Sequence, residues 1–169
     1  KYNNLMDSMD KKSRYDTESV IFFKGLLQRE LPLEIRRSIV SKLFMKFVRV
    51  TSENDFSQEL YMSEDDIKKL ISEDMYVGSH TYNHFWLSSF NYNLQLKEIN
   101  LSMEFLEKIG APTKNWIMCY PYGDYNKDTL KILKKLNCVI GLTTKVDKVI
   151  LGESDPLQYS RFDTNDYPQ

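Results

Sequence analysis

The chain contains only two histidines, His80 and His84, and they stand four residues apart after a short apolar run that begins at Met75. If that run is a strand, the histidines enter the loop or first helical turn that follows it, where open α/β folds place their ligands. Within one helical turn, side chains four apart share a face, with Cβ atoms about 5–6 Å apart. Neutral imidazole binds zinc and other late divalent metals. The pair therefore indicates a metal site, although two ordinary polar histidines give the same pattern.

The composition is that of one globular domain. The 169 residues are 41% hydrophobic and 28% charged, with a formal net charge of -1. A chain of this length can bury a core, and its charge balance gives no electrostatic argument for a nucleic-acid partner. No apolar run is long enough to cross a bilayer, and no secretory signal opens the chain.

These patterns leave the compartment and the oligomeric state unknown. The cytoplasm is slightly favoured because no signal segment is visible. The first residue is Lys1 rather than Met, so we expect the true N-terminus to lie outside this sequence.

The N-terminal third of the chain is predicted to be helical. After a polar lead-in, apolar residues recur at helical spacing from Thr17 to Val48. Leu31-Pro32 interrupts this rhythm, because proline cannot continue a helix interior. We expect a helical hairpin, followed by a polar connector over residues 51–57. Residues 1–57 are interpreted as a helical insertion or lead-in and residues 58–169 as an α/β portion, the two forming one domain.

The elements that must position the histidines alternate between strands and helices. Ser63 precedes three acidic residues and is predicted to cap a helix. The predicted elements that follow are a strand at Met75–Ser79, a helix at Tyr92–Ile109, strands at Trp116–Tyr120 and Cys138–Thr144 separated by a helix capped by Asn126, and a last strand at Leu157–Asp163. Right-handed crossovers would join such strands into a parallel sheet or a barrel segment.

Three further features remain open or neutral. The run Phe85-Trp86-Leu87 follows the histidines and could form a wall beside them or part of the core. Cys119 and Cys138 are predicted to be unpaired, buried thiols, because both lie in apolar runs. The turn-rich segment Pro121–Tyr125 follows a predicted strand, at the same sheet edge as the histidines.

Two stretches together resemble the polysaccharide deacetylases, the NodB-homology or carbohydrate esterase family 4 enzymes. His80-Thr81-Tyr82-Asn83-His84 is similar to their H-[ST]-x-x-H metal motif, and Tyr120-Pro121-Tyr122-Gly123 is similar to their R-x-P-[YF]-G loop. Gly141–Thr144 and Arg161–Asp163 also fit, so the resemblance runs from about Leu60 to Pro168.

The resemblance implies a distorted, incomplete (β/α) barrel, with the N-terminal helical hairpin as an insertion. It also implies a divalent metal, usually zinc, held by one Asp and two His, which polarises an acetyl carbonyl and activates a water so that acetate is released. His80 and His84 would be the two histidine ligands. The loop Tyr120, Pro121, Tyr122 and Gly123 would bind substrate, and the Tyr122 N–H would help to hold the oxyanion.

The sequence departs from the family pattern at three points. No Asp-Asp motif, the source of the catalytic base and third metal ligand, precedes His80. Cys119 stands where the second motif has Arg, and the general-acid His of the last motif is absent.

Three interpretations therefore remain. The favoured one is a metal-dependent hydrolase of an acetylated polysaccharide or glycan, whose catalytic Asp motif lies outside this chain. The second is a catalytically inactive glycan-binding module. The third is a structural or interaction protein in which the histidine pair is incidental. The sequence does not define the sugar or the acyl group.

Overall fold

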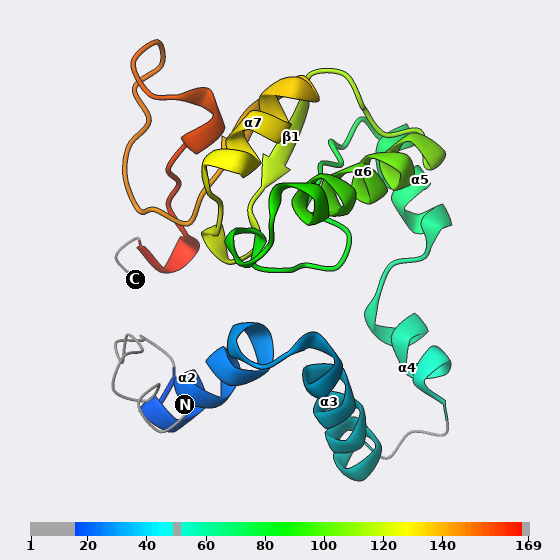
Figure 1. Cartoon of the computed structure of the whole chain (residues 1–169). Coiled ribbons are helices and arrows are strands. Elements are labelled where there is room, and N and C mark those ends of the chain that lie inside the picture. Colours follow the sequence, from blue (N-terminus) through cyan, green and yellow to red (C-terminus); the bar gives the residue numbers. More distant parts are fainter. Residues whose placement is uncertain (1–15, 49–51, 167–169) are drawn as a thin grey trace. The chain divides into compact units, whose positions relative to one another are not determined.

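The computed structural model describes residues 16–48 and 52–166, and the chain divides into two compact units, residues 1–59 and residues 60–169. The fold is mixed α/β and mostly helical, with a small parallel sheet in the second unit (Figure 1). The predicted polar lead-in before residue 15 lies outside the described residues. No helix in the described ranges has both the length and the apolar character that a membrane crossing requires.

The first unit contains three helical stretches. Helix α2 (Glu18–Gly25) continues into a π-helical turn, η1 (Leu26–Glu30), and α3 (Leu33–Phe47) begins after the predicted break at Leu31-Pro32. Helix α3 contacts η1 near this break, where Arg36 Nη1 donates to the Gln28 carbonyl. The helical prediction for this region is therefore confirmed.

The predicted polar connector is wrong, because helix α4 (Glu53–Leu60) occupies most of it. The Ser52 hydroxyl accepts a hydrogen bond from the Asp55 N–H at 3.3 Å, which satisfies one of the free donors at a helix start. Ring contact between Phe44 and Phe56, with centroids 5.6 Å apart, gives this helix an apolar face. Helix α5 (Glu64–Ser72) then begins at Ser63, whose predicted cap is a complete capping box with Asp66.

The sheet of the second unit is small and parallel. Strand β1 (Trp116–Cys119) pairs with β2 (Cys138–Leu142), as the sequence predicts. Single bridges extend it on both sides, from Ser79 to Met118 and from Leu142 to Tyr159. All four segments run in the same direction, so the loops that leave Ser79, β1 and β2 emerge at one edge.

The two outer predicted strands are therefore wrong beyond these single residues, for local reasons. At Met75–Ser79, the hydroxyl of Tyr76 accepts the Ile117 N–H at 2.8 Å, so a side chain takes the place of a backbone partner. At Leu157–Asp163, the Asp155 carboxylate caps a 3₁₀ turn, η4 (Pro156–Gln158), and leaves only Tyr159 to pair. The described residues form a short sheet, and the barrel implied by the resemblance stays a prediction.

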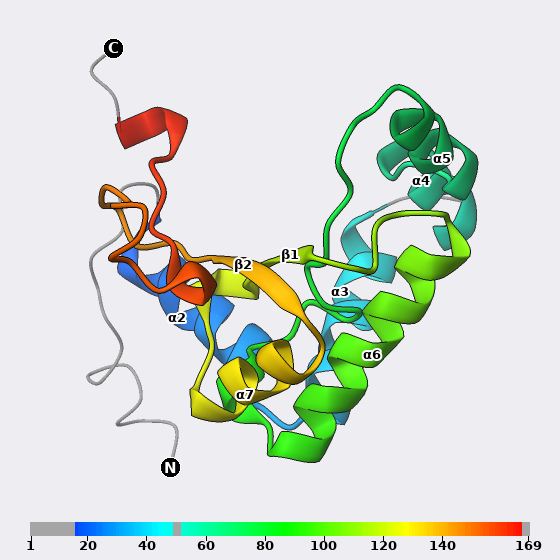
Figure 2. The ribbon, with the colours of Figure 1, turned by 90° about the horizontal axis from the view of Figure 1, so that it is seen from above.

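Helices α6 (Tyr92–Lys108) and α7 (Lys127–Lys135) pack against each other, and α7 packs against β2 (Figure 2). Apolar side chains from these elements form one core around Trp116; its buried members are Leu87, Ile99, Trp116, Met118, Tyr120, Ile132, Leu133, Cys138 and Leu157. Leu87 is fully buried, so the last residue of the predicted aromatic wall belongs to the core.

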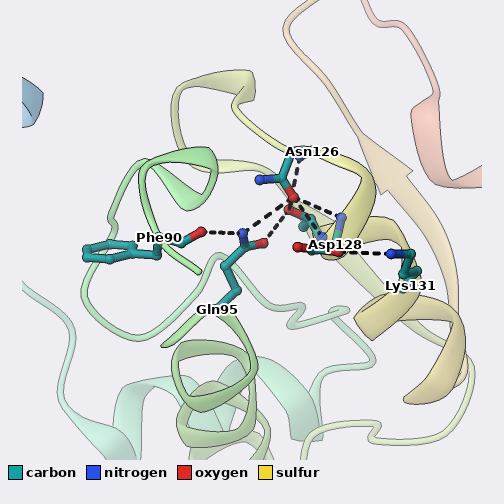
Figure 3. Close-up of polar contacts among 6 residues, drawn as sticks. Phe90, Gln95, Asn126, Asp128 and Lys131 are labelled. Carbon is teal, nitrogen blue, oxygen red and sulfur yellow. Dashed lines mark hydrogen bonds and ion pairs between the residues drawn. The ribbon is translucent and has the colours of Figure 1, made fainter. Parts of the chain in front are cut away.

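A buried polar network joins α6 to the start of α7 (Figure 3). The Gln95 amide donates to the Phe90 carbonyl at 2.8 Å and accepts from the Thr129 hydroxyl at 2.6 Å. Asn126, the predicted cap of α7, accepts from the backbone N–H groups of Asp128 and Thr129. The network fixes the direction in which the chain leaves the Pro121 loop and enters α7.

We expect Thr129→Val to lower the free energy of unfolding by about 1–3 kcal/mol, because it leaves the buried Gln95 oxygen without its donor. It also removes the acceptor that the Asn126 N–H uses in the capping box. Urea unfolding would measure the change, with Thr113→Val as the matched control. Equal stabilities for the two variants would contradict this role of the network.

Candidate metal centre

The loop that holds the two histidines, residues 80–84 (the histidine loop), leaves the sheet at Ser79. The Ser79 N–H donates to the Ile117 carbonyl at 3.0 Å, and the Cys119 N–H donates to the Ser79 carbonyl at 2.9 Å. These bonds place His80 beside the carboxyl end of β1, where parallel sheets bind ligands.

The two imidazoles contact each other edge to face, with ring centroids 4.7 Å apart and an interplanar angle of 69°. The loop between them contains no helical turn, and Thr81 and His84 both have a positive φ, of 62° and 55°. The sequence leaves open whether the histidines lie in a loop or in a first helical turn. In the structure they lie in a loop. Both histidines are exposed, so an ion could reach them from solvent.

The tautomer of His80 follows from its hydrogen bond. His80 Nδ1 lies 2.6 Å from the Cys119 carbonyl oxygen, which can only accept, so Nδ1 carries the proton. In the neutral imidazole, Nε2 then has the free lone pair with which the ring can bind a metal. A histidine that binds a metal commonly donates its other ring N–H in this way, which fixes the orientation of the ring.

The pKa of His84 is lowered from its ordinary value, first because partial burial disfavours the charged imidazolium and second because His80 adds like charge. A bond to the backbone opposes both effects without cancelling them. Neutral imidazole, the form that binds metals, is therefore favoured at His84 at neutral pH.

A second loop, the 3₁₀ turn η3 (Pro121–Gly123, the proline loop), lies against His84. The Tyr122 ring centroid is 4.7 Å from that of His84 at an angle of 73°, and Trp86 is stacked on Tyr122 at 4.6 Å and 10°. Of the run Phe85-Trp86-Leu87, Trp86 therefore contacts Tyr122, which in turn contacts His84. The structure brings together three residues that the sequence analysis selected: His80, His84 and Tyr122.

The proline loop depends on two left-handed residues, Tyr122 with φ 59° and Gly123 with φ 70°. A Cβ atom on Gly123 would lie 2.0 Å from the Thr144 Oγ1 atom, so glycine is required by space as well as by φ. The loop therefore sits tightly against the segment that follows β2.

The other two residues predicted to bind substrate have buried side chains. Tyr120 is 1% exposed, and its hydroxyl donates to the Leu157 carbonyl at 2.6 Å. Burial also raises the pKa of Tyr120. Pro121 is buried beside it. Both side chains are buried and support the proline loop from inside the protein. Their contact with substrate stays a prediction.

Several residues that sequence reasoning did not select hold these loops. The Asp124 carboxylate accepts from the Ser88 N–H and hydroxyl, both at 2.7 Å, which ties the proline loop to the chain after the histidines. The Glu98 carboxylate accepts two hydrogen bonds from Asn83 in the histidine loop. Glu98 had one signal in the sequence: it is a charged residue on the buried face of a predicted helix.

A cleft of about 800 Å³ borders the proline loop at Gly123. Its lining is mixed polar and apolar and includes Gly123, Tyr125, Thr143, Thr144, Ile150 and Gln158. Such a lining offers hydroxyl and amide groups to a ligand that can form hydrogen bonds.

The two cysteines are free, as predicted. Cys138 is buried, and burial raises its pKa to about 11. Cys119 is half-buried rather than buried, because it is the last residue of β1 and borders the His80 ring.

Within the described ranges, no group of three or more His, Cys, Asp or Glu side chains could hold a metal ion. The two facing imidazoles fit a zinc-type ion as part of a ligand set, since zinc accepts histidine nitrogen and catalytic zinc sites use three protein ligands.

Comparisons with known proteins identify the family of this chain. The polysaccharide deacetylase family model matches residues 39–140, more than half of the chain. The chain therefore belongs to the polysaccharide deacetylase family, and it carries part of the family domain. It is 23% identical over 142 residues to the Bacillus subtilis (strain 168) protein named "Putative polysaccharide deacetylase YxkH", a match that covers 84% of this chain and 50% of that protein. The chain thus spans about half the length of this curated relative.

Two solved structures are also similar to parts of the chain. The Streptococcus pyogenes deacetylase PplD in complex with acetate is 28% identical with a TM-score of 0.49, over 54% of this chain and 40% of that one. IcaB from Ammonifex degensii is 24% identical with a TM-score of 0.43, over 49% and 40%.

We expect His80→Gln to raise the pKa of His84 in the metal-free protein, because the variant removes a like charge. The pKa should stay below its ordinary value of about 6.5, since burial is the larger cause. Imidazole NMR signals as a function of pH would measure it. A His84 pKa unchanged by His80→Gln would contradict the close approach of the rings.

The lowered pKa also sets the direction of a stability change. As the pH falls below about 6.5, the unfolded chain takes up a proton that folded His84 resists. This part of the stability is present above that pH and is lost as the pH falls through the folded pKa.

We expect Gly123→Ala to destabilise the protein, by about 1–2 kcal/mol for the left-handed backbone and about 1–3 kcal/mol for overlap with Thr144. Adding Thr144→Ala should recover only the overlap part, because the backbone cost remains. Urea unfolding of the two variants and of Thr144→Ala alone would separate these contributions. If Gly123→Ala were as stable as the wild type, the described loop conformation would be wrong.

Proposed function

We propose that this chain carries the histidine ligands and the proline loop of a metal-dependent deacetylase that acts on an acetylated polysaccharide or glycan. The observation that carries the proposal is the meeting of His80, His84 and Tyr122 at the carboxyl edge of the sheet, in a chain of the polysaccharide deacetylase family. The substrate class is an extension from the family.

In this proposal, His80 Nε2 and a ring nitrogen of His84 hold a divalent metal, with zinc as the first choice. A bound metal of this kind would polarise the acetyl carbonyl and lower the pKa of a water. The Tyr122 N–H supplies a hydrogen bond to the developing oxyanion, which is the role expected from the resemblance. Pro121 and Gly123 hold that N–H in place.

The surroundings support binding of a sugar chain. The stacked pair of Trp86 and Tyr122 offers a flat apolar surface beside the histidines, and aromatic surfaces suit the apolar faces of sugar rings. The cleft bordered by Gly123 offers the hydroxyl groups of Thr143 and Thr144 to a neighbouring sugar unit.

The third metal ligand and the general base are proposed to lie outside this chain, on an Asp-Asp motif N-terminal to Lys1. The edge of the sheet at Ser79 is where a further strand could pair and continue toward the implied barrel. In the described part of the chain, the Asp and Glu side chains form no ligand group with the histidines.

We expect the 169-residue chain alone to release acetate poorly, and a longer natural chain that extends upstream of Lys1 to release it faster by about 10²–10⁴, the usual contribution of a general base. The measurement is acetate release from an acetylated oligosaccharide with added zinc. His80→Ala and His84→Ala in the longer chain should each abolish the zinc dependence, with Lys108→Ala as the control for surface substitution.

If the short chain releases acetate as fast as the longer one, no carboxylate upstream of Lys1 is needed. The third metal ligand must then be sought inside this chain. If neither chain releases acetate and both bind the oligosaccharide, the non-catalytic glycan-binding module replaces the proposed enzyme.

A further inference from the structure

Glu98 on α6 is the only buried carboxylate, amine or guanidinium side chain among the residues that the structure describes, and it is 8% exposed. Its two oxygens are both used by one residue of the histidine loop. Oε2 accepts from the Asn83 backbone N–H at 2.9 Å, and Oε1 accepts from the Asn83 side-chain amide at 2.7 Å.

A buried carboxylate is costly unless hydrogen bonds compensate for the lost water. Both donors here belong to Asn83, so the compensation depends on the histidine loop remaining closed over Glu98. Glutamine could accept only one of the two bonds, because its amide nitrogen would face a donor. The chemistry of this position therefore selects a carboxylate.

The backbone that Glu98 holds is under strain. Thr81 and His84 lie on either side of Asn83, and both have a positive φ. A residue with a side chain is disfavoured in this conformation and keeps it only when its surroundings enforce it. The other end of the loop is also tied to α6, because the Ser79 hydroxyl lies 2.8 Å from that of Ser102, one helical turn after Glu98.

We propose that Glu98 is a positioning residue for the histidine pair: through Asn83 it holds the loop so that the His80 and His84 imidazoles face one point. This inference rests on the proposed function for the metal that the pair would bind. Glu98 reaches His84 only through the neighbouring Asn83 backbone, and it acts by fixing the geometry of the loop.

The polarity of the contact allows a reciprocal test. In Glu98→Gln, the introduced amide NH₂ meets a donor of Asn83, so two donors oppose each other. In Asn83→Asp, the introduced carboxylate meets that of Glu98, so two acceptors oppose each other. The double variant Glu98→Gln/Asn83→Asp restores one donor for each acceptor, because the introduced glutamine can accept the backbone N–H through its oxygen while its amide donates to the introduced aspartate. Glu107→Gln makes the same chemical change at an exposed position of α6 and serves as the control.

Two readouts follow the imidazoles directly, because the chain has only two histidines. The first is the ring-to-ring nuclear Overhauser effect between His80 and His84 in the metal-free protein. The second is a zinc titration followed by the imidazole signals. We expect each single variant to weaken the ring-to-ring signal and to lower zinc affinity about 10–100-fold, as loss of a supporting contact commonly does. The double variant should recover both, and Glu107→Gln should change neither.

Wild-type zinc affinity and an intact ring-to-ring signal in Glu98→Gln would overturn the proposal, as would a double variant no better than the single ones. If the single variants lose helical circular dichroism and the double variant regains it without regaining the ring-to-ring signal, Glu98 is only a folding residue and the proposal fails. If the wild type shows the ring-to-ring signal but no zinc binding, and Glu98→Gln loses that signal, the positioning role holds and the proposed metal function fails.

Discussion

The pairing of Ser79 with β1 is the constraint on which the rest of the site depends. Its two backbone bonds, to Ile117 and from Cys119, set the register between the histidine segment and the strand. A shift by one residue would turn every side chain of the segment to the other face. With this register, the carbonyl of Cys119 lies where His80 Nδ1 can donate to it, so one pairing fixes both the position and the tautomer of the imidazole.

The remaining geometry comes from two strained loops held by buried supports. The histidine loop and the proline loop each contain two left-handed residues, three of which carry a Cβ. Their cost is offset by carboxylates that accept paired hydrogen bonds, Glu98 below the first loop and Asp124 beside the second. Glu98 stands on α6, whose Ile99 belongs to the apolar core around Trp116, so the packing of that core positions the support of the histidine loop.

Much of the second unit is predictable from the sequence because its signals are local. The caps at Ser63 and Asn126, the helical spacing of α6 and the short apolar runs of β1 and β2 each identify an element without knowledge of its neighbours. The outer strands were not predictable in this way. Their pairing depends on hydrogen bonds of single side chains, the Tyr76 hydroxyl with the Ile117 N–H and the Asp155 carboxylate with the Leu157 N–H, and the apolar pattern does not indicate these bonds.

The candidate site, too, is predictable from the sequence only where its signals are local. The spacing of His80 and His84 and the sequence around Pro121 identify residues that meet in space. The burial of the Tyr120 side chain, the stacking of Trp86 on Tyr122 and the bonds from Asn83 to Glu98 depend on contacts between distant segments, so no local pattern indicates them.

The central claim is that His80 and His84 converge on one divalent ion. X-ray absorption at the zinc edge, on protein loaded with one equivalent of zinc, tests it most directly because imidazole ligands give a characteristic scattering pattern. We expect two histidine nitrogens at about 2.0–2.1 Å from the zinc, and only one histidine nitrogen at this distance in His84→Ala. A zinc spectrum with no imidazole scattering, or one that His84→Ala leaves unchanged, would contradict it.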